Sequence, residues 1–389
     1  MKYLFLSILI FNGVAVFAQP KPTLLTGKTT GKLPYIKYGL GDDRLGGAKM
    51  TYLDTNIAVK VVDSILEDYK VQLSRLHFAY LPKTNFLKDS ISHQRAYYLS
   101  GSLKVFGDSV FDYVSINLDD RLPYRSIQQI SPSRILVDIF GVTSNTNWIT
   151  QLSTAKEIKN TWYEQIEDDV FRVFIELKHP QHWGHSIYYD STGRKLMVRV
   201  KRQPPVLDIH KMKIAIDAGH GGDNNGASGI TSKVLEKDYT LKIAKELEKL
   251  LKKNKVKTFM TRTSDTSLNM PERIEMLQAQ NPDFLISIHL NSSDVDTVRG
   301  TSTYYRYIGF RPLTQAVMKR MLELKLKEFG NVGNFNFALS GPTDYPNCLV
   351  EVAFLSNVLD EKKILDPKFH KAVANKIYLG ILDWLKQLK

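Results

Sequence analysis

The chain has 389 residues, of which 43% are hydrophobic and 24% are charged. This length predicts two or three domains, and this composition excludes a wholly disordered protein. The formal net charge is +13, and the basic residues are spread along the chain without a basic tail or arm. Such an even excess favours attraction to an acidic cell-wall polymer or a membrane surface, and we expect no nucleic-acid partner.

The N-terminus has the pattern of a secretory signal peptide. Lys2 precedes an apolar run that ends at Phe17, with small residues near a plausible cleavage point before Gln19. An uncleaved anchor is the alternative, although the run is shorter than the roughly 20 apolar residues that a spanning helix needs. We therefore assign residues 1–18 to a signal peptide and expect an exported protein of the periplasm or cell envelope.

The single cysteine, Cys348, excludes intramolecular disulfides. It lies in an apolar run, so we expect a small core residue without a catalytic role.

Residues 19–202 predict an all-β N-terminal part. Residues 19–48 are rich in Gly, Pro, Thr and Lys, which indicates an extended lead-in and not a packed element. Short alternating runs in residues 49–92 predict a small β-barrel-like region, and longer ones in residues 93–202 predict a β-sandwich. The order of strands near 134–139, 170–177 and 195–200 resembles the AMIN domain, a β-sandwich of exported envelope proteins. Any other β-sandwich remains the alternative.

Three histidines at a spacing of three, His179, His182 and His185, could suggest a metal site. Proline, tryptophan and glycine between them interrupt any helix, so the three rings need not converge. We expect a solvated loop between strands.

Residues 203–210 form a proline-marked linker, and residues 211–389 change to strands alternating with helices. This alternation predicts an α/β domain with a mixed, largely parallel sheet flanked by helices. Strands are expected at 214–216, 256–260, 284–288, 301–307 and 349–352. Helices are expected at 241–253, 271–280, 313–329 and 371–388.

Three side chains in this domain suit a metal ion. His220 follows the first strand in a glycine-rich turn, Glu236 lies where the first helix begins, and His289 ends a later strand. Two imidazoles and a carboxylate, with a fourth place open for water, form the ligand set of a catalytic zinc site. The gaps match no compact metal motif, so only the fold could bring the three together. We expect the glycines beside His220 to leave room for a bulky polymer.

Glu351 lies inside an apolar run, where a bare charge would be costly. It is therefore paired, liganded or catalytic. At a metal-hydrolase centre it would take a proton from water and deliver it to the leaving amine. A structural salt bridge to Arg262 or Arg273 is the alternative, and the residues alone leave both open.

Six separated segments between residues 212 and 388 resemble the zinc-dependent N-acetylmuramoyl-L-alanine amidases. They are residues 216–222, Glu236, residues 261–263, residues 271–273, residues 287–291 and residues 350–357. The resemblance implies that His220, Glu236 and His289 bind Zn²⁺ and that Glu351 is the general base and acid acting on a zinc-bound water. It also implies a hydrolase that cleaves the amide bond between N-acetylmuramic acid and L-alanine in peptidoglycan.

Two other functions stay open: a zinc exopeptidase acting on free peptides, and a non-catalytic scaffold that binds the cell wall. Asn291, two residues beyond His289, would hold substrate or cap a loop. The sequence departs from the family at Leu290 and Ala353, where alanine and glycine are usual.

Some members of the family carry a helical plug after the strand at 301–307, and a partner must remove it. This chain has no room for the plug, so we expect no obligatory activator. The β-domains could then bind peptidoglycan or proteins of the envelope and the division machinery.

Overall fold

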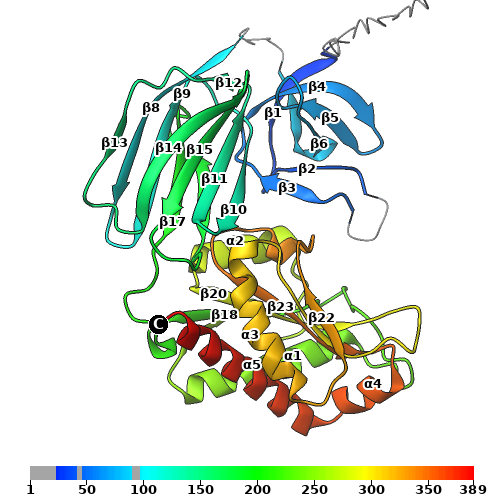
Figure 1. Ribbon diagram of the computed structural model, residues 1–389. Helices are drawn as coiled ribbons and strands as arrows, with labels where there is room; N and C mark the ends of the chain where they lie inside the picture. The colour runs from blue at the N-terminus through cyan, green and yellow to red at the C-terminus, as the bar shows by residue number, and fades with distance from the viewer. Residues whose placement is uncertain (1–22, 42–45, 90–96) are drawn as a thin grey trace, which may run out of the picture.

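The computed structural model describes residues 23–41, 46–89 and 97–389. Figure 1 shows two β units side by side above one α/β unit. The expected signal peptide, residues 1–18, lies outside the described residues. Among the helices in the described part of the chain, none is long and apolar enough to cross a membrane.

The first unit is a seven-stranded antiparallel sheet, here called the N-terminal sheet, with strand order β3-β2-β6-β5-β4-β1-β7. Its elements are β1 (Leu25–Thr29), β2 (Tyr35–Lys37), β3 (Lys49–Tyr52), β4 (Ala58–Ile65), β5 (Asp68–Gln72), β6 (Phe78–Pro82), η1 (Lys83–Asn85) and β7 (Phe86–Lys88).

The expectation of an unpacked lead-in over residues 19–48 is wrong for its described part. Strand β1 pairs with β4 and β7, β2 pairs with β3 and β6, and Ile36 is fully buried. Gly27 lies within β1, where an added Cβ would collide with the ring of Phe86. The glycine therefore serves strand packing and not chain flexibility.

The second unit is a β-sandwich of two sheets, with orders β10-β11-β15-β14 and β12-β8-β9-β17-β16 and with β13 paired to β8. Its strands are β8 (Tyr98–Gly107), β9 (Phe111–Leu118), β10 (Tyr124–Ile130), β11 (Ser133–Phe140), β12 (Val142–Thr143), β13 (Ile149–Gln151), β14 (Ile158–Glu167), β15 (Val170–Leu177), β16 (His185–Tyr189) and β17 (Lys195–Lys201). One hydrophobic core runs through this sandwich and the N-terminal sheet. The two β units therefore pack as neighbours, and the AMIN resemblance stays a prediction.

The third unit, here called the C-terminal domain, contains a six-stranded mixed sheet with order β19-β18-β20-β23-β21-β22. Its strands are β18 (Lys213–Ala218), β19 (Lys257–Met260), β20 (Phe284–Asn291), β21 (Thr301–Tyr304), β22 (Glu328–Val332) and β23 (Asn347–Phe354). Strands β19, β18, β20 and β23 run parallel, and β21 runs antiparallel to β23. Parallel strands end at one edge of the sheet, where α/β proteins place their sites.

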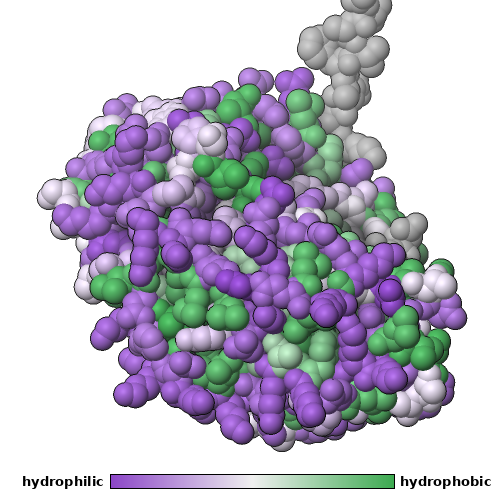
Figure 2. All heavy atoms as spheres, turned by 60° about the horizontal axis from the view of Figure 1, so that its bottom comes forward, coloured by the Kyte–Doolittle hydropathy of each residue, from purple (hydrophilic) through white to green (hydrophobic). Residues whose placement is uncertain are grey.

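Helices cover both faces of this sheet. They are α1 (Glu236–Lys253), α2 (Met270–Gln280), α3 (Arg311–Leu322), α4 (Val358–Ile364) and α5 (Pro367–Gln387), with short 3₁₀ turns η2 (Ile209–Lys211), η3 (Ile308–Phe310) and η4 (Ala338–Ser340). Helices α1, α3 and α5 enclose the larger core on one face. Helix α2 and η4 cover the other face, where Leu33 and Tyr52 of the first unit also pack. Figure 2 shows mainly hydrophilic side chains on the lower, C-terminal part of the molecule.

The helix expected over residues 313–329 ends early, at Leu322. Lys325 then adopts a left-handed conformation with φ 55°, which turns the chain into β22. Phe329 lies in that strand, and its ring packs 5.2 Å from the ring of Phe354. The apolar spacing that suggested one long helix therefore belongs to two elements.

The solvated histidine loop is also wrong. His182 and His185 are only 1% and 2% exposed. His182 Nε2 lies 2.9 Å from Gln129 O, His185 Nε2 lies 2.9 Å from Ser126 Oγ, and His179 bonds to a glutamate elsewhere. The rings have separate partners and form no metal site. They are buried because the C-terminal domain packs on this loop, where the His185 backbone bonds to Thr343.

Two amide side chains fasten the β-sandwich to the C-terminal domain at η3. Gln128 Oε1 accepts a hydrogen bond from Gly309 N at 2.9 Å. Gln181 Nε2 donates to Gly309 O at 2.8 Å, and its Oε1 accepts from Trp384 Nε1 at 3.1 Å. These buried contacts fix the position of the two units relative to each other.

The buried histidines predict an acid-sensitive stability. Burial lowers the pKa of His182 to about 4 and the pKa of His185 to about 3. The unfolded chain binds these protons near pH 6.5, so their stabilising effect is complete above that pH and is lost as pH falls toward the folded values. We expect the free energy of unfolding to decrease by about 2 kcal/mol per histidine between pH 7 and pH 5. Urea denaturation at both pH values measures this. Between these two pH values, the free energy of unfolding should decrease less in the His182→Gln/His185→Gln variant than in the wild-type chain. An equal decrease would contradict the assignment of the pH dependence to these histidines.

Candidate metal centre

The glycine-rich turn that follows β18 is held through its carbonyl groups. Arg262 Nε donates to Ala218 O at 2.9 Å and its Nη2 donates to Gly219 O at 2.8 Å. Arg273 donates from Nη1 to Ala218 O at 3.0 Å and from Nη2 to His220 O. His220 adopts a left-handed conformation with φ 61°. Such backbone is costly for a residue other than glycine, so the two arginines stabilise it.

An ion pair lies beneath this turn. Arg273 Nη1 and Asp217 Oδ1 are 2.6 Å apart, and both side chains are 1% exposed. Thr261 Oγ1 and Ser287 Oγ each donate to Asp217 at 2.7 Å. Burial by itself would raise the pKa of Asp217, but Arg273 and these hydrogen bonds outweigh it and hold the pKa below its usual range. The carboxylate therefore joins β18, β20 and α2 at one point.

The three expected ligands come together at the end of β18, β20 and the start of α1. Their ligand atoms lie within 4.8 Å of one another. Glu236 Oε1 lies 3.0 Å from His220 Nε2 and 3.1 Å from His289 Nδ1. Burial would raise the pKa of Glu236, but its hydrogen bonds to the two imidazoles outweigh this and lower it. The carboxylate is thus kept charged, as a metal ligand must be.

These residues could hold a metal ion. His289 Nε2 is buried and has no hydrogen-bond partner among the described residues. A bare buried polar atom is unfavourable, and a metal ion is one group that would satisfy it. Two imidazoles and a carboxylate are a donor set suited to a divalent metal.

Asn224 orients the first imidazole and was missed by sequence reasoning. Its Oδ1 accepts from Gly226 N at 3.2 Å, so the oxygen is the atom that lies 2.8 Å from His220 Nδ1. His220 Nδ1 then donates to this oxygen, and Nε2 is the ring nitrogen that faces Glu236. The only feature of the sequence that pointed to this role of Asn224 is its nearness to His220.

The glycines near the expected ligands have a steric role within the site. A Cβ added at Gly219 would collide with the ring of His289, and a Cβ at Gly226 would collide with Glu236 and His220. These glycines make room for the expected ligand side chains, and room for an approaching polymer stays a prediction.

A cavity of about 400 Å³ opens beside the three ligands. Glu351 lines it, whereas Arg262 and Arg273 donate hydrogen bonds to backbone carbonyls and to Asp217. Asn291 also lines it, with Nδ2 3.4 Å from Tyr304 Oη and Oδ1 accepting from Ser292 N at 2.8 Å. The position of Asn291 is therefore compatible with both expected roles, binding of substrate and capping of a loop.

Phe335 and Phe337 complete the lining of this cavity. Sequence reasoning missed both, because the segment that carries them has no metal-binding or charged residue to attract attention. Cys348 lies on the same strand as Glu351 but is fully buried, and burial raises the pKa of its thiol. It is a core residue, as expected.

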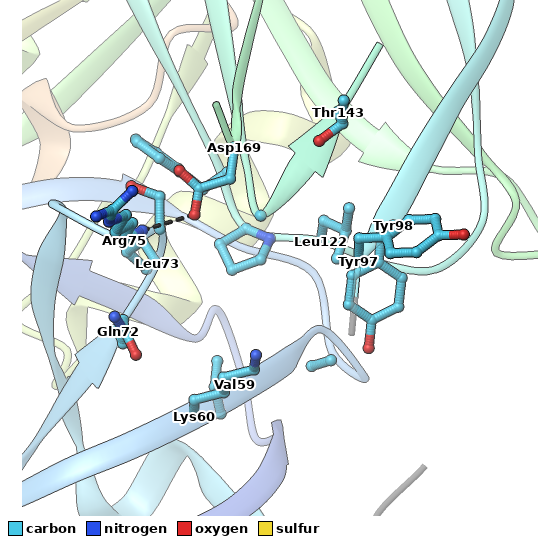
Figure 3. A pocket seen from close by; sticks show the side chains of 15 residues that line it. Val59, Lys60, Gln72, Leu73, Arg75, Tyr97, Tyr98, Leu122, Thr143 and Asp169 are labelled. Carbon is cyan, nitrogen blue, oxygen red and sulfur yellow. Dashed lines mark hydrogen bonds between the residues drawn. The ribbon is translucent and has the colours of Figure 1, made fainter. Parts of the chain in front are cut away.

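A second cavity, of about 260 Å³, lies between the N-terminal sheet and the β-sandwich. Figure 3 shows Arg75 and Asp169 on one side and Tyr97 and Tyr98 on the other, with a hydrogen bond from Arg75 N to Asp169 Oδ2 at 2.6 Å. Its lining, taken over the described residues, includes no histidine or cysteine and one carboxylate. This cavity offers no metal-binding set.

Comparison with known sequences identifies the C-terminal domain. Residues 214–383 match the profile of the family described as N-acetylmuramoyl-L-alanine amidase. The match assigns the C-terminal domain, and not the whole chain, to this family.

Curated relatives match the same region. The chain is 35% identical over 175 residues to the "Probable cell wall amidase LytH" of Staphylococcus epidermidis, which is 45% of this chain and 57% of the relative. It is 33% identical over 174 residues to the protein of the same description from Staphylococcus aureus, which is 44% of this chain and 57% of that relative. The chain thus spans 57% of the length of these relatives.

Solved amidase structures are also similar. The catalytic domain of CwlV from Bacillus (Paenibacillus) polymyxa var. colistinus is 33% identical, with a TM-score of 0.43, covering 46% of this chain and 99% of that one. An N-acetylmuramoyl-L-alanine amidase from Clostridium difficile 630 is 32% identical, with a TM-score of 0.44 and coverage of 46% and 98%.

The ion pair beneath the turn predicts a large loss of stability in Arg273→Met. The variant leaves the buried charge of Asp217 uncompensated, which costs about 3–5 kcal/mol. Urea denaturation measures the change. Lys252→Met is the control: Lys252 pairs with Glu248 at 2.8 Å but is 62% exposed, so its loss should stay within about 0.5 kcal/mol. Similar losses in the two variants would contradict a structural role for the buried pair.

Proposed function

We propose that the protein is an exported, zinc-dependent N-acetylmuramoyl-L-alanine amidase. It hydrolyses the amide bond between N-acetylmuramic acid and the L-alanine of the stem peptide in peptidoglycan. The observation that carries this proposal is the convergence of His220, Glu236 and His289 in a cavity that Glu351 also lines. The family to which the C-terminal domain belongs supports the choice of bond.

His220, Glu236 and His289 would hold the zinc ion. Zinc, when bound, lowers the pKa of water to about 7 and polarises a carbonyl group. Asn224 holds His220 in the tautomer that coordination requires, and Glu236 stays ionised between the two imidazoles. The protein thus supplies a preformed set of ligands, with little reorganisation on binding.

Glu351 is proposed as the general base and general acid. It is the register partner of His289 on the neighbouring parallel strand, so the two side chains stand on one face of the sheet about 5 Å apart at the backbone. From there the carboxylate takes a proton from the attacking water. It then gives that proton to the amine of L-alanine as the C–N bond breaks, which regenerates the carboxylate.

The size of the cavity suits a small part of a polymer. A volume of about 400 Å³ accommodates the lactyl group and the first residue of the stem peptide. The glycan strand would lie across the surface, where the net charge of +13 attracts acidic wall polymers. Binding of wall or envelope partners by the β units is an analogy from fold.

Digestion of purified sacculi tests the bond that is cleaved. We expect mass spectrometry to find free, intact stem peptides that begin with L-alanine, because the cut falls before that residue. Single amino acids released from free peptides would instead indicate an exopeptidase. Tight binding without any release would indicate a scaffold, and either result would overturn the proposal.

Glu351→Gln tests the mechanism. The amide cannot exchange the proton, so we expect turnover to fall by at least about 100-fold while zinc stays bound. Metal analysis of the purified variant measures one zinc per chain, and stem-peptide release measures turnover. His289→Ala serves as the contrast, because it should lose both zinc and activity. Undiminished release of stem peptides by Glu351→Gln would contradict the assignment of Glu351 as general base and acid.

A further inference from the structure

Two phenylalanines form an apolar side of the metal cavity, here called the aromatic wall (Phe335 and Phe337). The ring of Phe337 meets the ring of His289 edge-on, with centroids 5.1 Å apart. The ring of Phe335 lies 4.5 Å from the ring of Tyr304, whose hydroxyl is within reach of Asn291. Both phenylalanines are only partly buried, so they present apolar surface to whatever enters the cavity.

Asn336, between the two phenylalanines, is bound to the N-terminal sheet. Its Oδ1 accepts from Lys49 N, the first residue of β3, at 3.1 Å, and its Nδ2 donates to Gly47 O at 3.1 Å. Arg306 Nη1 donates to the same Oδ1 at 3.1 Å, and Arg306 Nη2 donates to Lys49 O. The Asn336 amide therefore bonds both to Arg306 and to residues of the N-terminal sheet that lie almost 300 positions away in sequence.

The N-terminal sheet also packs behind the wall. Phe337 joins the small core that contains Leu339, and Leu33 and Tyr52 of the N-terminal sheet reach the same core. This core covers the sheet face on which Asp217, His289 and Glu351 stand, as the strand register requires. In Figure 1, β2 and β3 lie on the side of the N-terminal sheet that faces the C-terminal domain.

We propose that Asn336 is a positioning residue through which the N-terminal sheet holds the aromatic wall in place, and that the wall binds the apolar part of the substrate. The proposal rests on the proposed amidase function. Next to the metal site, the substrate offers the methyl groups of the lactyl unit and of L-alanine and the apolar face of a sugar ring. Aromatic rings suit such groups. The N-terminal sheet then completes the substrate site of the same chain.

Kinetics of the full-length chain test the wall. With a soluble muramoyl peptide as substrate, Asn336→Ala should raise KM about 10-fold, equivalent to roughly 1.4 kcal/mol of binding, while kcat changes little. Zinc content should be unchanged, because Asn336 touches no ligand. Phe337→Leu should raise KM in the same way, and the double variant should add little, since both changes remove one interaction.

Gln128→Ala is the matched control, because it too removes an amide side chain that joins a β unit to the C-terminal domain. It lies outside the lining of the metal cavity, so KM should stay at the wild-type value. Asn336→Asp keeps the acceptor for Lys49 N and loses the donor to Gly47 O, and it should give an intermediate KM. A KM unchanged in Asn336→Ala, or raised equally in Gln128→Ala, would overturn the proposal.

A measurement independent of activity separates this proposal from the amidase function. The ring of Phe337 shifts the NMR signal of the His289 imidazole, which His289→Gln identifies by its loss. Asn336→Ala should move that signal, and Gln128→Ala should not. An unmoved signal refutes the positioning role whatever the enzyme does. An inactive wild-type chain with a moved signal refutes the amidase function and the substrate-binding role of the wall, and leaves Asn336 as a positioning residue only.

Discussion

The buried pair of Asp217 and Arg273 is the contact on which the candidate metal centre depends. Arg273 neutralises Asp217 and at the same time donates to the carbonyls of the turn that carries His220. A buried pair of this kind adds little net stability compared with apolar packing, but losing one partner is costly. Its main effect is specificity: it fixes where β18 stops and in which direction the first imidazole leaves the sheet.

The two faces of the C-terminal sheet differ in the side chains that they carry. The face toward α1, α3 and α5 is an apolar core. The opposite face carries Asp217, His289 and Glu351 and is covered by α2, η4 and part of the N-terminal sheet. Polar groups with chemical roles are thereby kept out of the main core, and the first β unit lies against the face that needs shielding from water.

Local pattern predicted much of the C-terminal domain and less of what surrounds it. The apolar runs around Ile216 and Ile288 predicted the central strands, and the motif residues predicted three ligands, whose side chains the structure brings together at one edge of the sheet. Packing between distant segments could not be predicted: the composition of residues 19–48 suggested an unpacked lead-in, and the spacing of His182 and His185 suggested a solvated loop. The contact between Lys49 and Asn336 joins residues almost 300 apart, and no pattern of composition or spacing encodes it.

The pairing of β20 with β23 has a consequence for how the site tolerates change. His289 and Glu351 are register partners, and successive side chains of a strand point to opposite faces. A slip of β23 by one residue would turn Glu351 into the apolar core and bring Val350 or Val352 to the cavity. The charge of Glu351 thus opposes misalignment of the two central strands during folding. The residue proposed to move the proton therefore also favours the correct register of the sheet.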